Sequence, residues 1–337
     1  MDFLKPGPKN LISDVKGIFV GNAEDQLVNT GTTIVTSNQP FVSSYKVLGG
    51  APGTRETDLL EPEKLVEQID AIVLSGGSAF GLEAASEVVN QLRRDDKGYP
   101  VGDHRVPIVP GAIIFDLTNG GTKTWRKNPY SDLAINAYRN ISINFMNGSY
   151  GAGKGAASGP IKGGLGSASL LVEDRFMVGA LMVVNSFGSP IVDNQPHFWA
   201  APYEIGDEFG GYGLPKDFNS FNPIRRASRE DFTKNTVIGI VATDAKLSKS
   251  QCKAMASTAH DGIARAIFPS HTSYDGDLIF SISTGTKPLQ QAPNDILQLN
   301  HAAALCVSRA IARGVYHATN SSNDLSPSFQ NKFSFKG

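Results

Sequence analysis

Apolar and polar residues alternate along the chain in two patterns. Short, nearly unbroken apolar runs predict buried strands, and they lie at residues 17–20, 32–36, 71–74, 106–115, 169–172, 178–184, 236–242 and about 278–283. Between several of these runs, apolar residues recur every three or four positions, which predicts amphipathic helices that start near Ser78, Ser248 and Asp295. Together these elements predict strands sandwiched between helix layers.

Two segments break this alternation. Residues 197–234 are irregular and rich in Gly, Pro, Asn and aromatic residues, and a connection of this length inside a compact domain is typical of a functional segment or of one that is cut. The tail, residues 320–337, is rich in Ser and Asn, so we expect it to be frayed. The chain of 337 residues is otherwise expected to form a single domain.

Composition and charge narrow the class of protein. Charged residues make up 19% of the chain and glycine occurs 35 times, which favours buried sheets with tight turns over a helical array or a disordered chain. The net charge of −1 gives no electrostatic reason to expect nucleic acid or an anionic membrane as a partner. No run approaches the roughly 18 apolar residues of a membrane span, and the first residues lack the apolar stretch of a signal peptide. We therefore expect a cytoplasmic protein.

The sequence carries no complete cofactor motif. Residues 148–155 resemble a phosphate-binding loop, but Gly155 stands where a Ser or Thr would hold Mg²⁺. Cys252 and Cys306 form no Cys-x-x-Cys pair and fall on predicted helix faces, so we expect reduced core residues. The histidines show no metal-ligand spacing and lie at positions 104, 197, 260, 271, 301 and 317. We expect no metal, nucleotide or organic cofactor.

The most informative position is the junction Asn235-Thr236. Thr236 opens the apolar run 237–242, and its hydroxyl would belong to an N-terminal nucleophile if the preceding bond were cut. A threonine that opens a strand is also simply a good β-former. The hypothesis of a nucleophile therefore depends on which groups accompany it.

Four other residues supply the groups that an activated hydroxyl needs. Asp275 and Asp277 precede a buried strand, Lys162 lies in a glycine-rich stretch, and Asn185 ends a strand. Carboxylates that orient a base, a cation, and an amide that donates to an oxyanion complete such a site. Each residue also has an ordinary explanation: an Asp-Gly-Asp turn, a surface lysine in a glycine loop and an asparagine in a turn.

Ser78 offers a rival nucleophile. The segment Gly76-Gly77-Ser78-Ala79-Phe80 lies between a predicted strand and a predicted helix and resembles a nucleophile elbow, but Phe80 replaces the required glycine. Ser78 is also a good helix N-cap. As a nucleophile with a distant His and Asp, it would make the protein a conventional serine hydrolase whose chain stays whole.

Five segments in order resemble the DmpA-like aminopeptidases, a family that includes β-peptidyl aminopeptidases, a pantetheine hydrolase and nylon-oligomer endohydrolases. The segments are GGAPGTRETD at 49–58, LSGGSAFGL at 74–82, IKGGLG at 161–166, Asn-Thr at 235–236 and Asp-Gly-Asp at 275–277. The resemblance runs from about Asn10 to His317. It implies an α+β fold, a four-layer αββα sandwich like that of the N-terminal-nucleophile hydrolases but with its own connectivity. It also implies self-cleavage into residues 1–235 and 236–337, and commonly a homo-oligomer, a tetramer of such cleaved αβ pairs.

The resemblance also implies a mechanism. The Thr236 hydroxyl attacks the Asn235 carbonyl, and the released α-amine, whose pKa is near 8 in short peptides, then serves as the base for the same hydroxyl. The resemblance implies that Asp275 and Asp277 orient this amine and that Lys162 biases the pKa values nearby. It implies that the amide of Asn185 donates a hydrogen bond to the oxyanion.

Two departures from the family pattern bear on the substrate. Many members carry a serine nucleophile with a Ser-x-Glu motif, whereas Thr236 with Asp275 and Asp277 is the pattern of the nylon-oligomer branch. The opening motif often ends in Val-Gly-His, where this chain has Asn22. We expect a cofactor-free amide hydrolase, of aminopeptidase type, that acts on short peptides or amino acid amides. The alternatives are a nylon-oligomer (aminohexanoate) endohydrolase of the same family and a catalytically inactive module that binds a small molecule.

Overall fold

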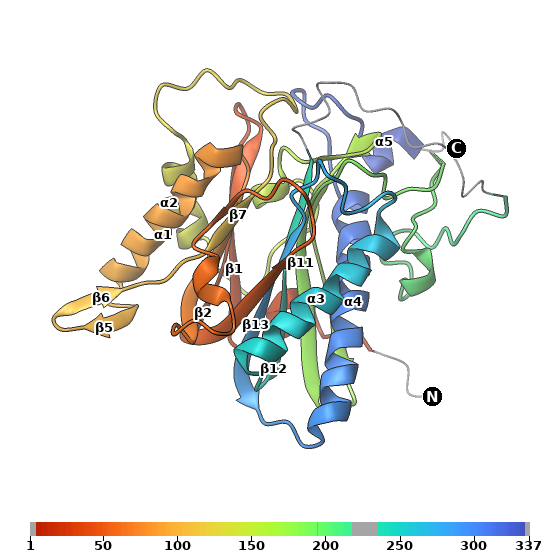
Figure 1. The fold of residues 1–337 in the computed structure, drawn as a ribbon. Helices are drawn as coiled ribbons and strands as arrows, with labels where there is room; N and C mark the ends of the chain where they lie inside the picture. Colours follow the sequence, from red (N-terminus) through yellow and green to blue (C-terminus); the bar gives the residue numbers. More distant parts are fainter. Residues whose placement is uncertain (1–4, 194, 218–234, 334–337) are drawn as a thin grey trace.

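The computed structural model describes residues 5–193, 195–217 and 235–333 (Figure 1). The strands are β1 Ile18–Asp25, β2 Thr30–Val47, β3 Thr54–Arg55, β4 Gln68–Ser75, β5 Tyr99–Val101, β6 His104–Val106, β7 Gly111–Ile113, β8 Ala157–Ser158, β9 Ile161–Lys162, β10 Gly164–Val172, β11 Phe176–Asn185, β12 Thr236–Ala245 and β13 Leu278–Lys287. The α-helices are α1 Glu83–Arg94, α2 Tyr130–Arg139, α3 Lys249–Ala266, α4 Ala292–Tyr316 and α5 Phe329–Phe333. None of these helices is long and apolar enough to cross a membrane.

One nine-stranded sheet organises the molecule. Its order is β10-β11-β12-β13-β2-β4-β7-β3, and β1 pairs with β2 off this path. Among the described strands of this sheet, β12 with β13 and β4 with β7 pair in parallel, and the other neighbours are antiparallel. The long strand β2 pairs with β1 along its first part and with β13 along its last part, and its pairing with β4 shifts register between Thr36 and Phe41.

Three apolar cores define four layers. One core joins α3 and α4 to the sheet half β10–β12, and another joins α1 and α2 to β1, β2 and β4. The third contains residues of both sheet halves, which therefore pack face to face. In Figure 1, α1 and α2 lie on one side of the strands, and α3 and α4 lie on the other. The expected αββα sandwich is confirmed.

Strand β12 lies between two of these cores, and all ten of its residues are buried. Because side chains alternate across a strand, Val237 and Val241 enter the helix-covered core, while Ile238 and Ile240 enter the core between the sheet halves. A slip of one residue would exchange these two faces, so packing on both sides fixes the register of β12.

Most predicted elements are present, with differences at their ends. Helix α3 begins after Ser248, which accepts a hydrogen bond from the backbone N–H of Gln251 as the capping-box spacing predicts. The strand predicted at 106–115 is wrong in extent, because Pro107 and Pro110 interrupt it and only 111–113 pair with the sheet. Helix α2 was not predicted.

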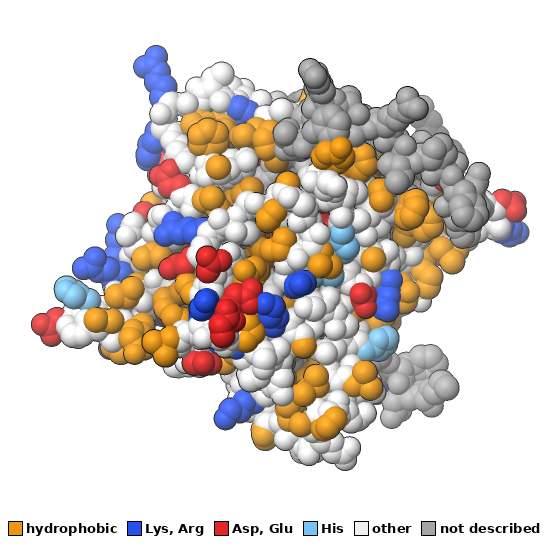
Figure 2. Space-filling view, viewed as in Figure 1, with side chains coloured by type: hydrophobic (Ala, Val, Ile, Leu, Met, Phe, Trp, Pro, Cys, Tyr) orange, Lys and Arg blue, Asp and Glu red, His pale blue; other side chains and the backbone are white. Residues whose placement is uncertain are grey.

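Both cysteines are buried and free, as expected. Burial raises the pKa of the Cys252 and Cys306 thiols to about 12, which keeps them protonated. The glycine-rich segment forms a short 3-10 turn at Gly151–Gly153, and the following Lys154 is buried rather than open to a phosphate. On the face shown in Figure 2, acidic and basic side chains lie next to one another, in keeping with the small net charge.

In its described part, residues 320–333, the C-terminal segment differs from the expectation of a frayed tail, and residues 334–337 lie outside the described part of the chain. Residues 320–333 pack on the body of the protein, and Phe329 is fully buried. Its ring stacks on Phe198 with centroids 4.8 Å apart and also contacts Tyr316 and Tyr212. The polar composition concealed this aromatic anchor. Of the irregular segment predicted at 197–234, residues 218–234 lie outside the described part of the chain.

Replacing this anchor tests the packed tail. Phe329→Ala should lower the free energy of unfolding by about 3 to 5 kcal/mol, because it removes a buried ring and leaves a cavity. Leu325→Ala, at a side chain that is 75% exposed, should change the free energy by less than about 0.5 kcal/mol. Chemical denaturation of both variants measures the difference, and equal midpoints would contradict the packing described here.

Candidate active site

Strand directions bring the predicted site residues to one edge of the sheet. β12 and β13 are parallel, so both begin at this edge, with Thr236 opening β12 and Asp277 directly preceding β13. β11 is antiparallel to β12 and ends here, which places Asn185 opposite Thr236. β10 is antiparallel to β11 and begins here, just after Lys162. Four stretches distant in sequence thus meet because of sheet topology.

The peptide between Asn235 and Thr236 is held in a specific geometry. The Thr236 hydroxyl donates to the carbonyl oxygen of Asn235 at 2.5 Å, and the backbone N–H of Gly276 donates to the same oxygen at 3.1 Å. A Cβ atom on Gly276 would lie 2.9 Å from the Thr236 hydroxyl oxygen and 2.6 Å from the carbonyl oxygen of Ala51, so this position requires glycine. Thr236 is only 4% exposed.

Asp275 and Asp277 are both 1% exposed and are held by hydrogen bonds. Asp275 accepts from the Thr272 hydroxyl at 2.6 Å and from the backbone N–H of Phe187 at 3.1 Å. Asp277 accepts from the backbone N–H of Val237, the residue after Thr236, at 2.9 Å. Burial, and then the negative charge of Asp277, raise the pKa of Asp275 to about 6.

His271 is a member of this site that the sequence analysis missed. Its Nδ1 lies 2.8 Å from a carboxylate oxygen of Asp277, and its backbone N–H donates to the same oxygen at 3.1 Å. Burial works against the imidazolium, but the hydrogen bond and charge of Asp277 outweigh it and raise the pKa of His271. The spacing of six residues matches no ligand or catalytic motif, so no local signal marked this histidine.

His260 packs against His271 with ring centroids 5.0 Å apart. It lies on the buried face of α3. Its Nε2 lies 2.9 Å from the carbonyl oxygen of Lys46. Burial lowers the pKa of His260 to about 4, so this ring is neutral beside the more basic His271.

Asn185 is oriented by three neighbours. Its side-chain oxygen accepts from the backbone N–H of Ala157 at 2.9 Å and from the Asn119 amide at 3.1 Å, and its own amide donates to the carbonyl oxygen of Phe115 at 3.2 Å. The two accepted bonds identify which end of the amide is the oxygen. Asn119 was not predicted, because it lies in a turn-rich stretch 66 residues before Asn185.

Lys162 is not a surface residue of a glycine loop. It is 2% exposed, and its ammonium donates to the carbonyl oxygen of Lys154 at 2.9 Å and forms an ion pair with Asp324. Across the short β8–β9 hairpin it pairs with Ala157, whose N–H binds Asn185. Burial lowers the pKa of Lys162, and Asp324 opposes that shift.

A second buried carboxylate lies near this hairpin. Asp116 accepts from the Thr30 hydroxyl at 2.6 Å and from the backbone N–H of Gly77 at 2.8 Å. Burial raises the pKa of Asp116, against the opposing charge of Lys123. The segment at 74–82 therefore holds this acid through its glycine turn.

The glycine pair at 49–50 has a steric explanation. A Cβ atom on Gly49 would lie 2.2 Å from the backbone nitrogen of Asp277 and 2.4 Å from the carbonyl oxygen of Asp275. The backbone N–H of Ala51 donates to that carbonyl at 2.9 Å. The loop at residues 49–51 thus packs directly against the Asp-Gly-Asp turn at residues 275–277.

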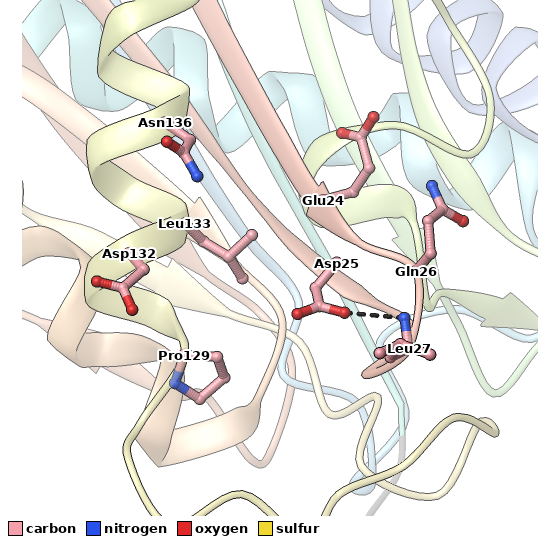
Figure 3. Close-up of a pocket in the computed structure, with 8 residues that line it drawn as sticks. All are labelled: Glu24, Asp25, Gln26, Leu27, Pro129, Asp132, Leu133 and Asn136. Carbon is pink, nitrogen blue, oxygen red and sulfur yellow. Dashed lines mark hydrogen bonds between the residues drawn. The ribbon is translucent and has the colours of Figure 1, made fainter.

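Ser78 does not form a comparable site. It adopts a left-handed φ of 52°, as a nucleophile elbow would, but among the described residues no histidine hydrogen-bonds to its hydroxyl. The pocket in Figure 3, about 340 Å³ in volume, lies between residues 24–27 and the start of α2, and no predicted site residue lines it. A smaller cavity of about 170 Å³ is lined by Lys162, Asn119 and Asp324.

Comparisons with known proteins show which family this chain resembles. The family model "Peptidase family S58" matches residues 10–324. An uncharacterized aminopeptidase of Mycobacterium tuberculosis is 37% identical over 331 residues, which cover 92% of this chain and 94% of the relative. A 6-aminohexanoate-oligomer endohydrolase of a Kocuria species is 24% identical and covers 85% of this chain and 78% of its own.

Solved structures share the fold. A Burkholderia β-aminopeptidase superposes with a TM-score of 0.70 at 19% identity, over 98% of this chain and 94% of the other. An L-aminopeptidase D-Ala-esterase/amidase of Ochrobactrum anthropi, described as a new variant of the Ntn hydrolase fold, gives a TM-score of 0.67 at 19% identity, over 93% and 88%. Because the family model spans nearly the whole chain, and a relative of 37% identity covers as much, this protein is a member of peptidase family S58.

Proposed function

We propose that this member of family S58 is a self-processing amide hydrolase with Thr236 as its nucleophile. The observation that carries the proposal is the position of the Thr236 hydroxyl on the Asn235 carbonyl group, with the Gly276 N–H on the same oxygen. A nucleophile next to a carbonyl and a backbone donor on the oxygen that will become negative are the two needs of acyl transfer.

Self-processing would proceed through an ester. The Thr236 hydroxyl oxygen attacks the Asn235 carbonyl carbon, and negative charge develops on the oxygen that Gly276 already contacts. Collapse breaks the carbon–nitrogen bond, and the hydroxyl proton passes to the departing nitrogen, which becomes the free α-amine of Thr236. Water then hydrolyses the ester, leaving residues 1–235 with a new carboxylate and residues 236–337 with an amino-terminal threonine.

The same groups would serve the hydrolysis of a substrate. The α-amine of Thr236 takes the proton of its own hydroxyl during attack. It would form where the backbone of Asp275 pairs with that of Asn235 in an isolated β-bridge and where the Asp277 carboxylate accepts from the next backbone N–H. This placement supports a role for the two acids in orienting the amine and stabilising its charge. His271, with its raised pKa, partly balances the two acids.

Asn185 and Lys162 would complete the site. Asn185 stands opposite Thr236 with a fixed amide, which supports its role as a donor to the substrate oxyanion. Lys162 supports Asn185 through the β8–β9 hairpin and contributes a buried positive charge that biases the pKa values nearby.

The substrate that we propose is a short peptide or an amino acid amide, cleaved in aminopeptidase fashion. The aminopeptidase relative of 37% identity supports this choice. Hydrolysis of aminohexanoate oligomers is the second candidate, because Thr236 with Asp275 and Asp277 follows the nylon-oligomer pattern and such an endohydrolase is among the relatives. A cytoplasmic location and a tetramer of cleaved pairs remain predictions from the sequence.

The first test is self-processing. Purified protein should separate into residues 1–235 and 236–337, about 25 and about 11 kDa of the 35.9 kDa chain, without an added protease. Thr236→Ala should stay full-length and inactive but folded, whereas Thr236→Ser should still process, because it keeps the hydroxyl. Mass spectrometry of the intact protein locates the cut.

The rival interpretations give different outcomes. Wild-type chains that stay whole and hydrolyse amides, with activity lost in Ser78→Ala, would establish the serine hydrolase. Chains that neither cut themselves nor hydrolyse any amide would indicate a binding module. Either result would contradict the role of Thr236 as the nucleophile.

The second test is pH dependence. Activity requires a neutral α-amine, whose pKa is near 8 in short peptides, and an ionised Asp275, whose pKa is about 6. Below pH 6 both groups are protonated, so the logarithm of kcat/KM should fall by two for each unit that the pH decreases. Between pH 6 and pH 8 only the amine is protonated, so the logarithm should fall by one for each unit. Asp275→Asn should keep a slope of one throughout, at a lower overall rate. A slope of two in this variant would remove Asp275 from the assignment.

His271 should affect the acidic part of the same pH profile. His271→Gln removes a positive charge beside the two acids, so the pKa of Asp275 should rise further and the steep limb should move to higher pH. His301→Gln, at an exposed position on α4, is the matched control and should leave the profile unchanged. An unshifted limb in His271→Gln would show that this histidine does not act on the acids.

The third test is the substrate class. A panel of aminoacyl p-nitroanilides, β-peptides and aminohexanoate oligomers should show hydrolysis of substrates with a free amino end, in the presence or absence of a chelator. Cleavage only of blocked or internal amides would favour the endohydrolase. Activity lost to the chelator and restored by a metal would contradict the proposed mechanism.

A further inference from the structure

The C-terminal segment carries an acidic residue into the region of Lys162. Asp324 lies 162 positions after Lys162 in the sequence, yet the two side chains form an ion pair and are only 3% and 2% exposed. A charge pair buried so completely is costly to form unless both partners are well satisfied. Its presence beside a proposed site therefore calls for a functional explanation as well as a structural one.

Further hydrogen bonds fix Asp324 in place. One carboxylate oxygen accepts from the Asn29 amide at 3.1 Å, and the other accepts from the backbone N–H and the hydroxyl of Ser321 at 2.6 and 3.1 Å. The backbone N–H of Lys162 donates to the carbonyl oxygen of Pro327 at 2.8 Å. The segment is thus attached to β9 by its backbone as well as by the ion pair.

A short series of contacts leads from this pair to the nucleophile. Lys162 pairs with Ala157 across the β8–β9 hairpin, Ala157 binds the side chain of Asn185, and Asn185 lies opposite Thr236. The cavity of about 170 Å³ has Lys162 and Asp324 in its wall, together with Asn119, the other donor to Asn185. Leu325 and Ser326, from the same C-terminal segment, also line it.

We propose that Asp324 is a positioning residue of the active site, which fixes the Lys162 ammonium and, through the β8–β9 hairpin, the amide of Asn185. This inference rests on the proposed function of the site. It makes the last part of the chain a component of the catalytic apparatus, so that self-cleavage requires the C-terminal segment to be docked.

The charge of Asp324 has a predictable effect on Lys162. Burial lowers the pKa of this lysine, and the hydrogen bond and charge of Asp324 oppose that shift. Without the carboxylate the pKa of Lys162 falls further, so the cation is lost at a lower pH. If the reaction needs this cation, its rate in alkaline solution should begin to fall at a lower pH than in the wild type.

The test is the variant Asp324→Asn in the full-length chain, which keeps the shape and removes the charge. We expect slower self-cleavage, a fall in kcat of roughly 10- to 100-fold, as misplacement of catalytic groups by about 1 Å causes, and an alkaline limb moved to lower pH. Asp324→Glu should restore part of the rate. Asn323→Ala, which changes the adjacent side chain that binds the carbonyl oxygen of Gln26, is the control and should behave as the wild type.

A double-mutant cycle separates positioning from mere folding. If Asp324 acts through Lys162, Asp324→Asn should have little further effect on kcat in a Lys162→Met background. If Asp324→Asn does not fold, Lys162→Met with Asp324→Leu replaces the pair by apolar groups, which buried sites often tolerate. That double variant should be folded and as slow as Lys162→Met alone.

The outcomes distinguish this inference from the proposed function. If the wild-type protein neither cuts itself nor hydrolyses amides, both the proposed function and the role of Asp324 are contradicted. If the wild-type protein cuts itself and hydrolyses amides, and Asp324→Asn has an unchanged kcat and pH profile, only the role of Asp324 is contradicted. Additive effects in the cycle, or a fully active Lys162→Met/Asp324→Leu variant, would likewise overturn it.

Discussion

The candidate site depends on the burial of strand β12 on both of its faces. Apolar side chains alternate between two cores along this strand, and a shift by one residue would place each of them in the wrong core. The register is therefore fixed with β11 from Thr236 to Thr243 and with β13 from Ile238 to Thr243. Thr236, as its first residue, is held at a defined point relative to Asn185 on one side and the Asp-Gly-Asp turn on the other. A large apolar core thus sets the position of a few polar atoms at its edge.

At that edge the protein buries several charged or polar side chains, which opposes folding unless they are satisfied. The carboxylates of Asp275 and Asp277 lie close enough that burial and mutual repulsion raise the pKa of Asp275. His271, backbone N–H groups and the Thr272 hydroxyl offset this cost. Such a concentration of perturbed groups is typical of a functional site rather than of a stabilising network.

Glycine allows these groups to approach so closely. Gly276 lies against the Thr236 hydroxyl, and Gly49 lies against the backbone of Asp277. Side chains at either position would separate the loop, the turn and the nucleophile. The glycine-rich segments that drew attention in the sequence are therefore conditions for assembling the site, and their backbone atoms supply hydrogen bonds directly to it.

The sequence by itself predicted strands sandwiched between helix layers, because the apolar runs and helical periodicities record which faces are buried, and the resemblance to a known family implied the four-layer α+β arrangement. It also pointed to Thr236, Asn185 and the Asp-Gly-Asp turn, because polar residues at the ends of apolar runs form recognisable local patterns. Only the tertiary structure decided that His271 binds Asp277 and that Asp324 pairs with Lys162. Asp324 lies in a polar stretch without periodicity, and its partner is distant in the sequence, so no local pattern records their contact. A long-range pair of this kind is decided by how the C-terminal segment packs, and that packing follows from the anchor at Phe329, whose neighbours come from several distant parts of the chain.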